Sequence, residues 1–163
     1  MLISTELGQA FNEQIGHELG ASIQYIAIAS YFEAQNLKLL AKLFFEQAEE
    51  EKEHAMKFVR YLTDTDGDLR IPAIPAPKHD FQSAEQAVEA ALSWEKEVTG
   101  QINNLMQRAI AGNDYLAQSF LQWFVDEQLE EITKMSSLLS VVRRAGERNL
   151  LMVEAYLVHL GTE

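Results

Sequence analysis

The sequence predicts an all-α protein: a four-helix bundle with a long crossover between helices two and three and a short fifth helix at the C-terminus. Three observations predict this fold. Helix-breaking residues lie at only a few places among the 163 residues, and all three prolines fall in one stretch. The long segments between the breaks carry apolar residues at the three-to-four-residue spacing of a buried helix face. Each of these faces is apolar at both ends and polar in its middle.

The first two helices are predicted at residues 5–35 and 37–64, with a turn at Asn36. Their inward faces alternate steps of four and three residues, as bundle helices do. Residues 65–82 contain Pro72, Pro75 and Pro77. Because proline lacks an amide hydrogen and clashes inside a helix, this segment is predicted to be a crossover between two halves of the bundle.

The second half is predicted to contain helices at residues 83–111 and 115–145 and a tail helix at 147–160. Ser83, followed three residues later by Gln86, is a capping-box pattern for a helix start. Asn113 and Asp114 lie in the turn before the next helix, and Gly146 separates that helix from the tail. A chain of this length is expected to form a single domain over residues 1–163.

Composition excludes several classes of protein. The chain has 13 Lys and Arg against 25 Asp and Glu, a net charge of −12, which argues against a nucleic-acid partner and permits cations. It has no cysteine, so disulfides, thiolate nucleophiles and cysteine-bound metals are excluded. No segment approaches the roughly 20 continuous apolar residues of a membrane span, and no membrane partner is expected. The N-terminal residues do not resemble a signal peptide, so a cytoplasmic location is expected.

The polar residues on the inward faces are predicted to form one layer across the bundle. Glu18 and His54 lie equally far before and after the turn at Asn36, so they meet at one level of the first hairpin. The same offset, 95 − 18 = 77, carries this hairpin onto the second and suggests two related halves. The complete layer comprises Glu18, Glu51, His54, Glu95, Gln128 and Glu131.

Four carboxylates facing an apolar core need protons or cations between them, because an unpaired buried charge costs several kcal/mol. Oxygen donors with one imidazole suit iron or manganese better than a soft metal, although zinc could compete. We therefore predict a dinuclear metal site. The alternative is that these are ordinary solvated or hydrogen-bonded glutamates.

Residues next to the layer suggest two additions. Glu50, Glu127 and Glu130 could form a further, more exposed cation site, or they could be a solvated acidic face. Tyr25 lies on the inward face two turns from Glu18 and could give a hydrogen bond or an electron to the site. A core tyrosine with a satisfied hydroxyl is the alternative.

This pattern resembles the ferritin superfamily along the whole chain. Glu18, the run Glu51-Lys52-Glu53-His54 and Glu95 match its first three helices. The fourth helix reads Gln128-Leu129-Glu130-Glu131 instead of a second Glu-x-x-His, and this is similar to the prokaryotic non-haem ferritins. The segment from Phe120 to Phe124, followed by Glu127 and Gln128, also resembles that group.

The resemblance implies a ferroxidase and iron store with a ferritin-like bundle. Two Fe(II) ions would be oxidised by O2 or hydrogen peroxide, and ferric mineral would be stored in a homo-oligomeric cage of twenty-four subunits. Glu18, Glu51 and His54 would hold one iron; Glu95, Glu51 and Glu131 would hold the other, with Glu51 bridging. Gln128 would orient the oxygen species, Tyr25 would be the aromatic partner, and Glu50, Glu127 and Glu130 would form a third iron site, with Glu131 as a candidate fourth ligand.

Haem is not expected. Bacterioferritins ligate it through a methionine two positions before a histidine of the second helix, and Lys52 occupies that position here. Two other functions stay open at this point. One is a non-catalytic bundle that only buffers metal ions, and the other is a di-iron or di-manganese oxygenase acting on an organic substrate.

The tail helix carries more apolar residues than one face needs and must be covered by something. A neighbouring subunit is the expected cover, and the end of its own bundle is the alternative.

Overall fold

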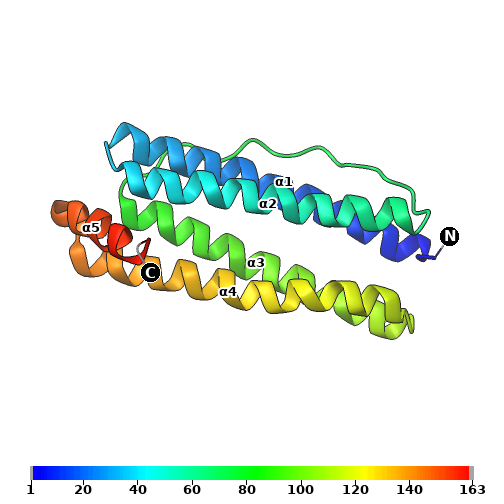
Figure 1. Cartoon of the computed structure of the whole chain (residues 1–163). Helices are drawn as coiled ribbons and strands as arrows, with labels where there is room; N and C mark the ends of the chain where they lie inside the picture. The colour runs from blue at the N-terminus through cyan, green and yellow to red at the C-terminus, as the bar shows by residue number, and fades with distance from the viewer. Residues whose placement is uncertain (1, 162–163) are drawn as a thin grey trace.

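The computed structural model describes residues 2–161, which form four long helices and a short fifth one (Figure 1). They are α1 (Thr5–Ala34), α2 (Lys38–Asp64), α3 (Ala84–Ala111), α4 (Tyr115–Ala145) and α5 (Leu150–Leu160), and a 3-10 turn at Glu147–Asn149 precedes α5. The described residues contain no strand, and the predicted all-α fold class is confirmed. The long helices begin and end within one residue of the predicted ranges.

Local sequence explains where the helices begin. Three of the four long helices start with a side chain that accepts a hydrogen bond from a backbone amide of the first turn: Ser4 for α1, Ser83 for α3 and Asp114 for α4. The two hairpin turns contain Asn36 and Asn113, with φ of 59° and 52°. Asparagine tolerates this left-handed conformation better than most residues, so both turns are encoded locally.

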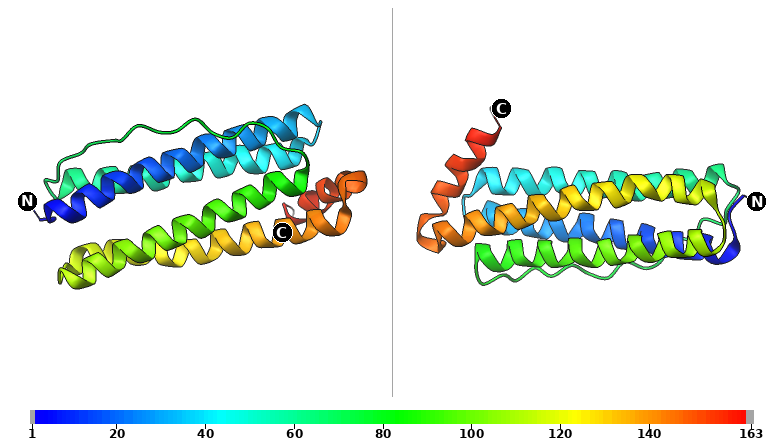
Figure 2. Two further views of the ribbon diagram at one scale, coloured as in Figure 1. Left: turned by 180° about the vertical axis from the view of Figure 1, so that it is seen from behind. Right: turned by 90° about the horizontal axis from the view of Figure 1, so that it is seen from below.

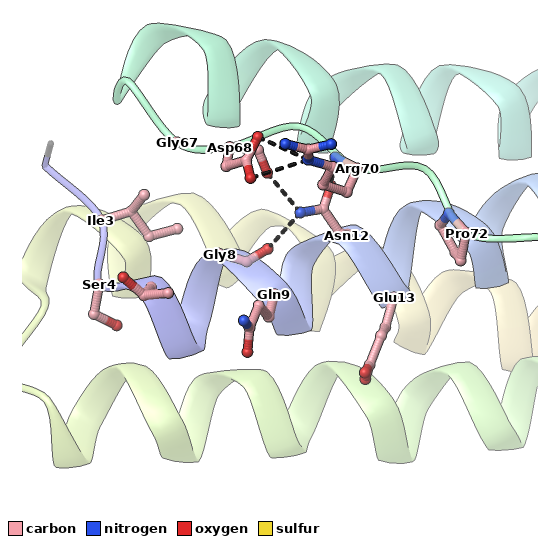
Figure 3. A pocket seen from close by; sticks show the side chains of 11 residues that line it. Ile3, Ser4, Gly8, Gln9, Asn12, Glu13, Gly67, Asp68, Arg70 and Pro72 are labelled. Atoms are coloured by element: carbon pink, nitrogen blue, oxygen red, sulfur yellow. Dashed lines mark hydrogen bonds and ion pairs between the residues drawn. The ribbon is translucent and has the colours of Figure 1, made fainter.

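The crossover between α2 and α3 runs along the bundle beside α1 (Figures 1 and 2). The Asn12 amide donates to the Asp68 carbonyl at 2.8 Å and accepts from the Arg70 amide at 2.7 Å (Figure 3). Gln24 makes the same two-way contact with the backbone of Lys78, at 2.9 Å in each direction. Two amide side chains of α1 therefore fix a segment that has no regular structure of its own.

A glycine and a pocket mark this contact. A Cβ atom at Gly16 would lie 2.5 Å from the ring of Pro72, so the crossover approaches α1 more closely than alanine would permit. A pocket of about 440 Å³ lies between the start of α1 and the crossover, and Figure 3 shows the side chains that line it. None of the predicted metal ligands lines it, and we assign it no role in the site.

The core is split into two apolar clusters. One contains Ile28, Phe32 and Phe44 and lies toward α5, and the other contains Phe11 and Phe58 and lies toward the opposite end. The polar layer separates them. Its buried side chains are Glu18, Gln47, Glu51, His54, Glu95, Gln128 and Glu131. The apolar packing that holds the bundle together thus encloses the polar layer from both sides.

Helix α5 packs against the end of its own bundle (Figure 2). Val153 is fully buried there, and the Glu154 carboxylate accepts hydrogen bonds from the amides of Leu39 and Leu40 at 3.0 and 2.9 Å. Other apolar side chains of α5 stay exposed: Leu151, Met152, Val158 and Leu160. Its own bundle covers one face of the tail, and a second apolar face is left uncovered.

No helix within residues 2–161 combines the length and the hydropathy that a membrane span requires.

Candidate metal centre

The four long helices bring the predicted carboxylates together in the middle of the bundle. Ligand atoms of Glu18, Glu51 and His54 all lie within 4.8 Å of one another, and the same holds for Glu51, Glu95 and Glu131. These five residues are at most 4% exposed. Glu51 belongs to both groups, so the structure contains two overlapping sets of metal-ligand atoms with one shared carboxylate.

Helical spacing places the two predicted ligands of α2 on one side. Glu51 and His54 are three residues apart, and His54 Nδ1 lies 3.1 Å from Glu51 Oε2. The His54 ring packs edge-to-face against Trp123 and Phe124, at centroid distances of 5.4 and 5.9 Å. Trp123, which a core-packing role would bury, is 41% exposed. Its ring connects the imidazole with the surface.

Glu18 has an unusual hydrogen-bonding state. Its Oε1 accepts from the buried amide of Gln14 at 3.0 Å. Its Oε2 is buried and no amide or hydroxyl of the described residues donates to it, although Glu18 and Glu51 can share a proton. A buried oxygen without a donor costs free energy that a bound cation would remove. This observation, and the donor set of carboxylates with one imidazole, fits a hard divalent cation.

Glu95 is positioned by two donors. The Tyr25 hydroxyl donates to Glu95 Oε1, and the Gln128 amide donates to Glu95 Oε2 at 3.2 Å and to Thr99 Oγ1 at 3.1 Å. Tyr25 therefore contacts the site directly while it also fills the core. Gln128 lies at the predicted place, and here its amide group orients a carboxylate.

Burial raises the pKa of every carboxyl group in the layer. Desolvation is the main cause for Glu18 and Glu51, whose pKa values lie well above the ordinary range, and the charges of Glu51 and Glu95 respectively add to it. Desolvation also raises the pKa of Glu95, and it raises that of Glu131 to about 8. Without a cation the layer retains protons, and a binding metal ion must displace them.

Tyr25 is expected to remain a donor throughout. Desolvation, with the charges of Glu95 and Glu51, raises the pKa of its hydroxyl well above the ordinary value. The neutral phenol keeps the proton that it shares with Glu95.

The residues of the predicted third site do not all converge as the inner carboxylates do. Glu127 and Glu131 form a group with His54 whose ligand atoms lie within 4.8 Å, but no such group of described residues contains Glu50 or Glu130. Glu50 instead contacts the Lys134 ammonium at 3.5 Å, and Glu130 is exposed. The metal count of this outer region stays a prediction.

Sequence reasoning missed four polar residues in or beside the layer. Gln14 and Lys134 lie off the predicted inward faces, and nothing in the sequence marked them. Gln47 and Thr99 lie on those faces, but a neutral polar side chain there does not by itself indicate a contact with the carboxylates. Gln47 contacts two carboxylates: its amide donates to Glu51 Oε1 at 3.3 Å and also to Glu131 Oε2.

Comparison with known proteins identifies the family. The family model for the ferritin-like domain matches residues 8–145. The chain is 40% identical over 152 residues to ferritin BfrB of Mycobacterium tuberculosis, covering 93% of this chain and 83% of the relative. It is 36% identical over 146 residues to the bacterial non-heme ferritin of Staphylococcus aureus, covering 90% and 88%.

The fold is also similar to that of solved structures. An open pore ferritin from the archaeon Archaeoglobus fulgidus superposes with a TM-score of 0.92 at 32% identity and covers 96% of both chains. The family model spans most of this chain, and the relatives exceed 30% identity over nearly all of it. The chain belongs to the ferritin family of iron-storage proteins.

Proposed function

We propose that this ferritin is a ferroxidase that oxidises Fe(II) at a dinuclear centre in each subunit. The observation that carries the proposal is the pair of buried ligand groups that share Glu51. Glu18, Glu51 and His54 would bind one iron, and Glu51, Glu95 and Glu131 the other. A shared carboxylate keeps two metal ions close enough to act on one oxidant.

The ligand set favours the oxidised product. Each Fe(II) ion loses one electron, and the pair reduces O2 to hydrogen peroxide or hydrogen peroxide to water. Carboxylate ligands stabilise Fe(III) more than Fe(II), because the additional charge is felt through short oxygen contacts. Binding would also displace the protons that Glu18 and Glu51 retain without a cation because their pKa values are raised.

The surrounding polar residues would hold this geometry. Tyr25 and Gln128 each donate to Glu95, so they fix the carboxylate of the second iron. Gln128 would also orient the oxygen species. As a neutral amide it binds Fe(III) more weakly than a glutamate would, and this would help the product leave.

We also propose that the oxidised iron is stored as ferric mineral inside a homo-oligomeric cage of twenty-four subunits. The exposed apolar residues of α5 support an assembly, because a monomer would leave them in water. The structural likeness to solved ferritins supports the same proposal.

The test is the growth of ferric absorbance after Fe(II) is added in air. The parent should show a rapid phase, and Glu51→Ala should slow it by at least about 100-fold, because the substitution removes a ligand of both irons. Glu46→Ala is the matched control, since Glu46 lies on the same helix but is exposed and pairs with Lys42. A parent that binds Fe(II) without oxidising it would be a metal buffer and would contradict the proposal.

A further inference from the structure

Lys134 lies among acidic residues where the sequence predicts a third metal ion. We call Glu50, Glu127, Glu130 and Glu131 the outer acidic cluster. Lys134 follows Glu131 by one turn of α4, and its Nζ reaches across to α2. There it lies 3.0 Å from Gln47 Oε1 and 3.5 Å from Glu50 Oε2. A cation of the chain itself therefore contacts the cluster.

Gln47 connects this ammonium to the dinuclear centre. The Gln47 side chain is buried, accepts from Lys134 through Oε1 and donates through Nε2 to Glu51 and Glu131. An ammonium group can only donate, so it orients the Gln47 oxygen outward and the amide NH2 toward the carboxylates. Lys134 thus fixes the side chain that separates the outer cluster from the bridging ligand.

Lys134 faces the cluster as a cation. Its side chain is 43% exposed and pairs with Glu50, so it keeps the positive charge of an ordinary lysine. The carboxylates of Glu131, Glu50 and Glu127 attract this charge. The group facing the cluster is a full positive charge, attracted by three of its four members.

We propose that the Lys134 ammonium takes the place of a third metal ion, so that each centre holds two ions. A metal ion in the outer acidic cluster would have to displace the ammonium from Glu50 and Gln47 or bind beside it. Two cations at such short range repel each other strongly in a partly buried site. The inference rests on the proposed dinuclear centre and adds the residue that sets its metal number.

The experiment counts Zn(II) ions bound per subunit by calorimetry on the complete, metal-free protein. Zinc accepts carboxylate and imidazole ligands and has no redox chemistry, so binding is separated from oxidation. The parent should bind two ions. Lys134→Met keeps most of the side-chain volume but removes the charge, and it should bind three.

Three further variants locate the effect. Lys134→Arg keeps the charge and should bind two ions. Lys42 and Lys134 line one pocket, and Lys42 pairs there with Glu46. Lys42→Met removes this second lysine and should also bind two. Adding Glu50→Gln to Lys134→Met should return the count from three to two, because the third ion loses a carboxylate ligand.

The outcomes distinguish this inference from the proposed ferroxidase. Three ions in the parent, or two in Lys134→Met, would overturn the role of Lys134 whatever the oxidation rate. Two ions in the parent with no Fe(II) oxidation would overturn the ferroxidase and leave the metal count intact. Should Lys134→Met lose its native melting transition, Lys134→Gln gives the same test with an uncharged polar side chain.

Discussion

The four buried glutamates lower the stability of the metal-free protein more than its other residues do, because burying a carboxylate costs free energy. Each has been removed from water, and each faces at least one other carboxylate across a few ångströms. In the metal-free protein they are accommodated by protons and by donors such as Gln14 and Tyr25. The same features that make the layer unfavourable without a cation would make it a strong cation site, since a metal ion would remove the repulsion and contact the unpartnered oxygen of Glu18.

A pH prediction follows at the scale of one residue. The pKa of Glu131 is about 8 in the folded protein against 4.5 for the free side chain. Between these values the folded state holds a proton that the unfolded state has lost. The stability contributed by this proton is complete below about pH 4.5 and is lost as the pH rises through 8. One such group changes the free energy of unfolding by at most about 1.4 kcal/mol per pH unit.

The measurement is the thermal unfolding midpoint of the protein in chelator between pH 5 and pH 8. The midpoint should fall with rising pH, and Glu131→Gln should reduce the slope because the amide cannot ionise. Glu130→Gln, a neighbouring exposed residue, should leave the slope unchanged. Equal slopes in the parent and Glu131→Gln would contradict the raised pKa.

At the scale of elements, α5 caps the N-terminus of α2. The N-cap residue of α2 is Leu37, whose side chain makes no capping hydrogen bond. Glu154 of α5 caps α2 instead: its two carboxylate oxygens accept hydrogen bonds from the backbone amides of Leu39 and Leu40. A carboxylate at a helix N-terminus is also favoured by the helix dipole. Glu147 acts similarly on the first turn of α3, at 3.2 Å from the amides of Ala84 and Glu85.

Glu154→Ala should destabilise the start of α2 and the docking of α5. The loss of two charge-assisted hydrogen bonds is expected to cost about 1–3 kcal/mol. Amide hydrogen exchange of Leu39 and Leu40 measures it directly, because these amides lie in the first turn and have no partner within their own helix. Exchange as slow in Glu154→Ala as in the parent would show that the cap contributes nothing, and Glu46→Ala serves as the unaffected control.

Local signals and periodicity in the sequence predict the helices and the polar layer, but not the contacts between distant residues. The helix bounds follow from local signals, such as Ser83, Asn113 and the prolines, and these were predicted closely. The polar layer follows from periodicity, because Glu51 and Glu131 interrupt otherwise apolar faces. The capping by Glu154 and the contact between Lys134 and Gln47 join residues far apart in the chain. No local pattern encodes such pairs, so they required the structure.

The whole molecule combines an acidic surface with an uncovered apolar face. The net charge of −12 is partly buried in the layer, and the remaining acid repels other copies unless a specific interface overcomes it. Leu151 and Met152 on α5 offer apolar area of the kind that subunit contacts bury. These features agree with an assembly whose acidic surfaces attract Fe(II) toward the centres.

The native mass and the iron content of the protein, measured together after Fe(II) is added in air, test the central claim most directly. We predict an assembly of twenty-four subunits that carries far more iron than two ions per subunit. Glu51→Ala should assemble to the same mass and take up little iron over the same time. A parent with the 18.5 kDa mass of a single chain, or one holding no more iron than its binding sites, would contradict an iron-oxidising storage cage.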